Sequence, residues 1–154
     1  MLNRQRGFSL IELIVVVVML SIIASVATPS FQSMIRKVKL EGGQGDVVKM
    51  LKEAKRIARS ESTTVSVTLD NQASAPSRVI LASNSGVGKT EDISAGVTFE
   101  SEQTVVFTAM GAVTPPPGQP LFRLVLEDAV TSQKRYVDVT ATGQVISHSP
   151  NFSP

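Results

Sequence analysis

Residues 1–31 read MLNRQRGFSLIELIVVVVMLSIIASVATPSF, and this stretch decides the fold of the chain. A short basic leader ends at Gly7, and the apolar run that follows holds a single acid, Glu12. The 21 residues from Phe8 to Thr28 would form a helix about 31 Å long, which matches the hydrocarbon thickness of a bilayer. Length argues against a strand, because strands rarely exceed about ten residues. We therefore predict a transmembrane helix over residues 8–28.

The acid inside the apolar run needs a partner. Placing Glu12 in a membrane span costs roughly 2.5–3.5 kcal/mol on insertion scales. A positively charged α-amine opposite its carboxylate would lower the cost of burying either charge. Arg4 and Arg6, taken alone, favour a cytoplasmic N-terminus, whereas the basic residues after Pro29 weaken that argument.

The sequence Gly7-Phe8-Ser9-Leu10-Ile11-Glu12, at the head of an apolar helix, resembles the processing site of type IV prepilins and of the pseudopilins of type II secretion. The resemblance implies that a prepilin peptidase cuts between Gly7 and Phe8 and that the new amine of Phe8 is methylated. It assigns charge pairing with the terminal amine of a neighbouring subunit to Glu12, and a helix kink to Pro29.

The same resemblance implies partners and a location. The helix would be held in the bacterial inner membrane, with the C-terminal domain in the periplasm, and would later form the filament core. Its partners would be other pilins or pseudopilins, the prepilin peptidase and an inner-membrane assembly platform.

Two simpler interpretations of the N-terminus remain open. An ordinary secretory signal peptide has a similar basic start, and Ser25-Val26-Ala27 is an acceptable cleavage site. The product would be a soluble secreted binding domain that begins at Thr28. A plain single-span anchor is the other interpretation. Neither explains Gly7-Phe8 or Glu12.

Composition limits the remaining part of the chain. Without the apolar helix about 120 residues are left, enough for one domain with a modest core. The chain has no cysteine, which excludes disulfides, thiol catalysis, zinc fingers and iron–sulfur sites. Eight basic residues lie between residues 36 and 59, whereas five basic and nine acidic residues follow Ser60. We expect a basic stalk and an acidic head.

The stalk shows helical periodicity with one interruption. An apolar stripe at helical spacing runs from Val47 to Ala58. The run Gly42-Gly43-Gln44-Gly45 costs roughly 3 kcal/mol in a helix relative to alanine, so we predict a break, a kink or a locally melted turn there. The expected organisation is a leader over 1–7, the span over 8–28, the stalk over 29–60 and the head over 61–154.

The pattern changes to period 2 in the head. The strand candidates are Thr64–Leu69, Arg78–Ala82, Val97–Glu100, Thr104–Phe107, Leu121–Glu127, Arg135–Thr140 and Gln144–Ser147. Short connections favour antiparallel pairing. A long helix followed by several short strands predicts an α+β fold, in which the helix packs on an antiparallel sheet.

Three fragments of the head also resemble a narrower group. They are Ala58–Glu61, Phe107 with Gly111 four residues later, and Thr142–Val145. Together they resemble the GspH/FimT group of minor pseudopilins and minor pilins. This resemblance implies a β-sandwich-like head packed on the helix.

Several motifs invite a chemical interpretation that their surroundings do not support. Residues 83–90 differ from a phosphate-binding loop only at Ser83, but no helix follows Lys89, so we predict a flexible surface loop. His148 lies in a Ser/Pro-rich tail, and we expect it to be solvated. Glu127 and Asp128 lack a ligand-spaced loop, so we predict a solvated hairpin end and no calcium site.

The basic residues between 36 and 59 leave three interpretations open: a solvated helix face, contact with anionic lipid headgroups, or contact with nucleic acid. Nucleic acid is the partner we least expect, because this stretch has no aromatic residue. No catalytic set is recognisable, and we expect no enzyme activity, no metal and no cofactor. We predict a minor pseudopilin of type II secretion, with a minor pilin of a type IV pilus, serving DNA uptake in one version, as the alternative.

Overall fold

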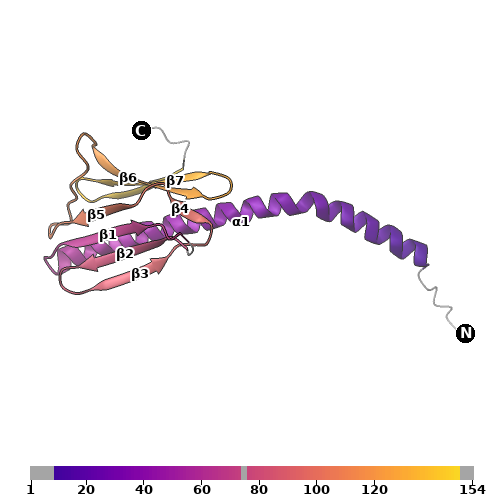
Figure 1. The fold of residues 1–154 in the computed structure, drawn as a ribbon, viewed down its shortest axis with the longest axis horizontal. Helices are drawn as coiled ribbons and strands as arrows, with labels where there is room; N and C mark the ends of the chain where they lie inside the picture. The colour runs from indigo at the N-terminus through magenta and orange to yellow at the C-terminus, as the bar shows by residue number, and fades with distance from the viewer. Residues whose placement is uncertain (1–8, 74–75, 150–154) are drawn as a thin grey trace, which may run out of the picture. The chain divides into compact units, whose positions relative to one another are not determined.

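The computed structural model describes residues 9–73 and 76–149, which form one helix and eight strands (Figure 1). The elements are α1 (Leu10–Ser60), β1 (Val65–Asp70), β2 (Arg78–Ser83), β3 (Gly88–Asp92), β4 (Val97–Phe99), β5 (Gln103–Phe107), β6 (Leu121–Asp128), β7 (Lys134–Thr140) and β8 (Val145–His148). The predicted α+β class is confirmed, because one long helix precedes strands that all pair antiparallel.

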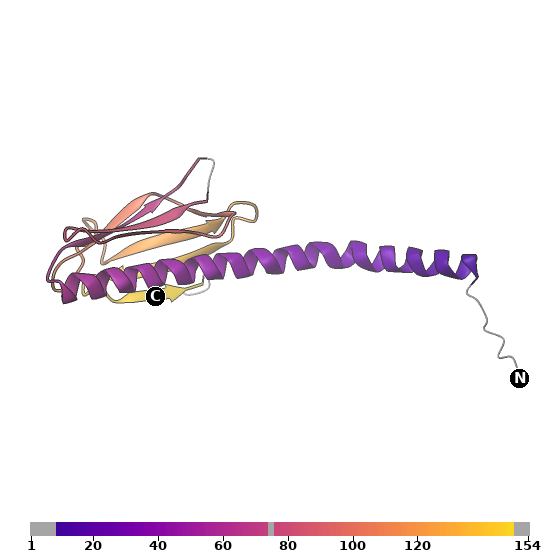
Figure 2. The same ribbon diagram turned by 90° about the horizontal axis from the view of Figure 1, so that it is seen from below.

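The chain divides into two compact units, residues 1–35 and residues 36–154. The described part of the first unit is the beginning of α1, a helix that carries Pro29 inside it. The second unit holds the rest of α1 and every strand. Within this second unit the strands gather along the C-terminal part of α1 (Figure 2).

Two four-stranded sheets build the second unit. One has the order β3-β2-β1-β5 and the other the order β4-β6-β7-β8. In β1, Val65, Val67 and Leu69 are buried and alternate with half-buried residues, as the period-2 pattern predicts. The same alternation puts Leu124 and Leu126 of β6 into the core.

The core lies between the sheets and the last turns of α1. The helix contributes a stripe of buried side chains at helical spacing, formed by Leu40, Val47, Met50, Leu51, Ala54, Ile57 and Ala58. Because the chain has no disulfide, burial of this apolar surface is the main stabilising term of the domain. The C-terminal part of the helix therefore belongs to the same packed domain as the strands, and we call residues 36–154 the head from here on.

The helix continues through Gly42–Gly45, so the predicted break is absent. Tertiary packing explains the difference. A Cβ on Gly43 would lie 2.9 Å from Cγ2 of Ile93 and 3.5 Å from a methyl of Val97. At Gly43, the missing side chain lets the helix backbone approach the sheets. The packing gained there outweighs the low helix propensity of glycine.

The segment predicted as a flexible loop after Ser83 contains a strand. β3 pairs with β2 in antiparallel register, and Lys89 lies opposite Leu81. This strand stands where a phosphate-binding loop would need the start of a helix. Its side chains are mostly exposed and polar, which is why the hydrophobic pattern did not reveal it.

The acidic end of β6 is also buried more than predicted. Asp128 is 4% exposed and accepts hydrogen bonds from the backbone N–H and the hydroxyl of Thr131, at 2.8 and 2.5 Å. Burial by itself raises the pKa of Asp128, but the hydrogen bonds from Thr131 outweigh it and lower the pKa below its usual value. The carboxylate thus closes the turn between β6 and β7 instead of facing solvent.

Two glycines and the end of α1 form a tight junction. A Cβ on Gly143 would lie 2.0 Å from the carbonyl oxygen of Gly111, and one on Gly111 would lie 2.9 Å from Cδ of Arg59. Both glycines have positive φ, +68° and +76°. Lys55 donates hydrogen bonds to the carbonyls of Thr142 and Gly143 at 3.0 and 2.9 Å. The fragments that resemble the GspH/FimT group thus meet in space.

We predict that Gly143→Ala destabilises the head by about 3 kcal/mol. The alanine would be strained in the left-handed backbone conformation, and its Cβ would clash with the carbonyl oxygen of Gly111. Gly86→Ala is the matched control, since Gly86 has φ +89° but nothing within 4 Å of its Cβ position. The control should lose about 1–2 kcal/mol. Urea unfolding of the full chain in detergent measures both. Equal losses of unfolding free energy in the two variants would contradict the close contact between Gly143 and Gly111.

We also predict an acid-dependent contribution from Asp128. Its folded-state pKa lies below the unfolded value, so its stabilisation is present above about pH 4 and is lost as the pH falls further. The stability difference between the wild type and Asp128→Asn should therefore shrink between about pH 6 and pH 2. Asp92→Asn, on the exposed edge strand, serves as the control. A difference that stays constant over this range would refute the prediction.

Candidate assembly site on the N-terminal helix

The beginning of α1 is organised by Ser9. Its carbonyl accepts hydrogen bonds from the backbone N–H groups of Glu12 and Leu13, at 3.1 and 3.2 Å. Ser9 is thus the N-cap of the helix, and Glu12 occupies its third position. The spacing Ser9-x-x-Glu12 is that of a capping box, which accepts either glutamate or glutamine at its last position.

The helix that follows presents apolar side chains all round. From Leu10 to Ile23 the large hydrophobic residues are between 44% and 76% exposed. Among the described residues, α1 is the one helix long and apolar enough to span a membrane, with a mean hydropathy of 2.8 over 18 residues. None of that window is buried in the chain itself. Such a surface requires lipid or other protein as its environment.

Glu12 is the one charge on this surface. Its position in the first helical turn places the carboxylate near the unsatisfied N–H groups and the positive end of the helix dipole. Each of these local effects, the helix dipole and an N-cap, is typically worth about 1 kcal/mol. At these typical values they fall short of the roughly 2.5–3.5 kcal/mol that a charge costs at the centre of a membrane span.

The other predicted residues of this site divide into two groups. Pro29 lies inside α1, as predicted, and the kink assigned to it stays a prediction. The predicted cleavage position, Gly7, and methylation position, Phe8, lie outside the described residues.

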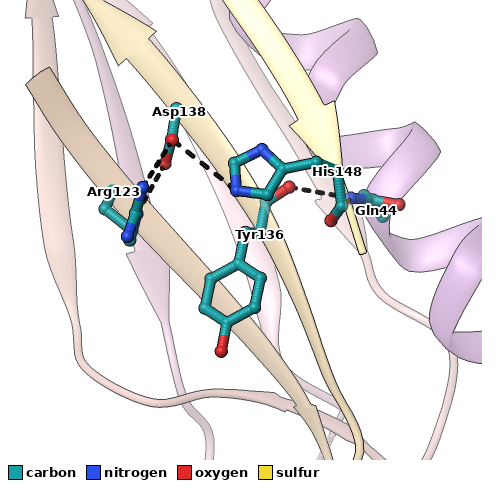
Figure 3. Close-up of polar contacts among 5 residues, drawn as sticks. All are labelled: Gln44, Arg123, Tyr136, Asp138 and His148. Atoms are coloured by element: carbon teal, nitrogen blue, oxygen red, sulfur yellow. Dashed lines mark hydrogen bonds and ion pairs between the residues drawn. The ribbon is translucent and has the colours of Figure 1, made fainter. Parts of the chain in front are cut away.

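A second polar cluster lies on the sheet β4-β6-β7-β8 (Figure 3). Asp138 of β7 is 4% exposed and accepts two hydrogen bonds from Arg123 of β6, both at 3.0 Å. These bonds raise the pKa of the Arg123 guanidinium, which stays charged. The guanidinium also lies 5.7 Å from the ring centre of Tyr136. The paired geometry compensates the burial of the Asp138 carboxylate.

His148 belongs to this cluster, so the prediction of a solvated tail histidine is wrong. Its ring stacks on Tyr136 with centroids 5.5 Å apart, and its side chain is 11% exposed. From α1, the amide nitrogen of Gln44 donates to the carbonyls of Tyr136 and His148 at 2.8 and 3.2 Å. The cluster ties the last strand to both β7 and the helix.

The contacts within the cluster join neighbouring strands. The His148 Nε2 atom lies 3.7 Å from a carboxylate oxygen of Asp138, within ion-pair distance when the imidazole is protonated, and Arg123 donates to both oxygens of that carboxylate. Sequence reasoning did not identify Gln44, Arg123 or Asp138. The weak signal available was the charged residue inside each of two apolar strands, which cross-strand pairing places opposite each other.

Comparison with known proteins gives a motif and a fold. Residues 2–28 match the family described as the prokaryotic N-terminal methylation motif. Among curated proteins none matches the sequence. Two crystal structures of the type IV minor pilin FimU from Pseudomonas aeruginosa (strain PAO1) match the fold. One has 16% identity and a TM-score of 0.58, and covers 77% of this chain and 94% of that chain. For the other form the values are 15%, 0.55, 75% and 97%.

The chain therefore combines the methylation motif of type IV prepilin-like proteins with a pilin fold. The motif covers the leader and the apolar helix, and the fold similarity extends over most of the chain. An exposed apolar N-terminal helix and a folded head fit a membrane-anchored, pilin-like protein.

Proposed function

We propose that this pilin-like chain is a minor subunit of a filament, either the pseudopilus of type II secretion or a type IV pilus. The observation that carries the proposal is Glu12, a carboxylate at the head of an apolar helix that finds no burial within its own chain. The methylation motif over residues 2–28 supports it.

The proposed mechanism is assembly by exchange of surroundings. After cleavage at Gly7 and methylation of Phe8, the helix is held in the inner membrane and the head lies in the periplasm. Transfer into the filament replaces lipid by neighbouring helices. The exchange costs little because both environments are apolar. The pairing of Glu12 with a neighbour's terminal amine then sets the register.

The role proposed is structural and not enzymatic. The contacts of the polar cluster around Asp138 join neighbouring strands of the head, which supports a structural use of these charged groups. The partners proposed are other pilins or pseudopilins, the prepilin peptidase and the assembly platform, all acting on the N-terminal segment.

Two observations favour different filaments, one the pseudopilus and the other the type IV pilus. The fragments around Gly111 and Gly143 resemble the GspH/FimT group, which contains pseudopilins. The fold is similar to FimU, a minor pilin of a pilus. Deletion of the gene in its native host separates the two. Loss of secreted enzymes with normal pili indicates the pseudopilus, and loss of surface pili with normal secretion indicates the pilus.

We predict that Gly7→Glu leaves the leader attached. A large charged residue at this position blocks the assigned cleavage, so the intact mass should show the complete chain. Gly45→Ala is the matched control, and its mass should correspond to a chain that begins at methylated Phe8. Normal trimming of Gly7→Glu, or a wild-type chain that begins at Thr28, would contradict the assignment.

We predict that Glu12→Val is inserted and processed but incorporated into filaments at least tenfold less than the wild type. The reason is the loss of roughly 1.4 kcal/mol or more of charge pairing. Quantitative immunoblotting of sheared filaments against membranes measures the ratio.

Glu12→Gln distinguishes charge pairing from helix capping. Glutamine completes a capping box but carries no charge. The proposal requires Glu12→Gln to fail like Glu12→Val. Incorporation of Glu12→Gln at the wild-type level would show that Glu12 acts as a cap and would refute charge pairing.

A further inference from the structure

Gly42 and Gly45 have no packing reason to be glycine. Both are exposed on α1, one turn apart, and a Cβ at either position would meet nothing within 4 Å. Gly43 between them is buried, and its Cβ would lie 2.9 Å from Ile93. Close packing therefore requires one glycine of the three. The other two weaken the helix relative to alanine with no steric benefit in the folded head.

The helix is held very differently on the two sides of this segment. After Gly45, the side chains of Val47, Met50, Leu51, Ala54, Ile57 and Ala58 are all buried in the core. Between residues 36 and 41, Leu40 is the one buried apolar side chain. Glu41 adds an ion pair with Arg135 at 3.0 Å, but its side chain is half exposed. The glycines thus mark the border between a firmly and a lightly held part of the second unit.

At this border, the side chain of Gln44 attaches the helix to the sheet. Its side-chain amide donates to the carbonyls of Tyr136 and His148, at 2.8 and 3.2 Å (Figure 3). These two bonds, together with the close approach at Gly43, hold a helix turn whose own propensity is low. Breaking them would release the turn and expose Leu40, while the buried side chains from Val47 onward stay in the core.

We propose that Gly42–Gly45 is a flexing point of α1. The helix opens there locally, residues 36–41 come away from the sheet, and the remainder of the head stays folded. The role that we give to this opening in filament assembly rests on the proposed function. A subunit that moves from lipid into a filament keeps its head folded while its anchoring helix changes surroundings. A turn that opens independently of the core permits this.

Hydrogen exchange on the full chain in detergent micelles tests the opening. The backbone amides of residues 43–49, whose helical bonds cross the segment, should exchange at least tenfold faster than those of residues 50–58. The double variant Gly42→Ala/Gly45→Ala should slow them by about 25-fold, roughly fivefold for each glycine. Lys52→Ala, on the same exposed face, is the control and should change nothing. Equal exchange in both stretches, unaffected by the alanines, overturns the proposal.

Incorporation into filaments tests the use. The double variant should be incorporated less than the wild type. Adding Gln44→Ala to it should restore incorporation, because loss of the two Gln44 hydrogen bonds compensates for the stiffer helix. If the triple variant stays defective, the added methyl groups obstruct a neighbouring subunit, and the flexing role is overturned. Undiminished incorporation of the double variant overturns it as well. Absence of the wild type from filaments refutes the proposed function instead, and leaves the exchange result standing.

Discussion

The electrostatic cost of keeping the Glu12 carboxylate in an apolar environment is the constraint on which the proposed assembly depends. The helix around it is exposed along its whole apolar window and is long enough to cross a bilayer. Capping and the helix dipole recover part of the cost, but not the whole of it. We propose that a cation from another polypeptide supplies the rest. The exposed apolar window of α1 fits the proposal that its surroundings are lipid and the helices of other subunits.

The head is a domain of modest size that is stabilised without disulfides. It achieves this by making the end of α1 part of its core and by bringing backbones very close together. Gly43 permits the approach of helix to sheet, and Gly111 and Gly143 permit the contact of two loops beside Lys55. The paired charges of Arg123 and Asp138 then join β6 to β7.

The parts of this structure that follow from local pattern were predictable. The apolar run with Glu12 predicts the first helix, and alternation such as that of Val65, Val67 and Leu69 predicts the strands of the core. The strand from Gly88 to Asp92 was missed because an exposed edge strand has no apolar face to reveal it. Helix continuity through Gly43 was missed because contacts with Ile93 and Leu126, distant in sequence, override propensity there. His148 was misplaced for the same reason, since its partners lie on a neighbouring strand and on the helix.

The most direct test is the distance between the Glu12 carboxyl carbon and the terminal nitrogen of Phe8 in assembled filaments. Solid-state NMR on filaments that mix ¹³C-labelled and ¹⁵N-labelled subunits measures it between chains only. Charge pairing predicts an ionised Glu12 with a neighbour's nitrogen within about 4 Å. A protonated Glu12 carboxyl group with no intersubunit dipolar coupling to nitrogen would contradict the account.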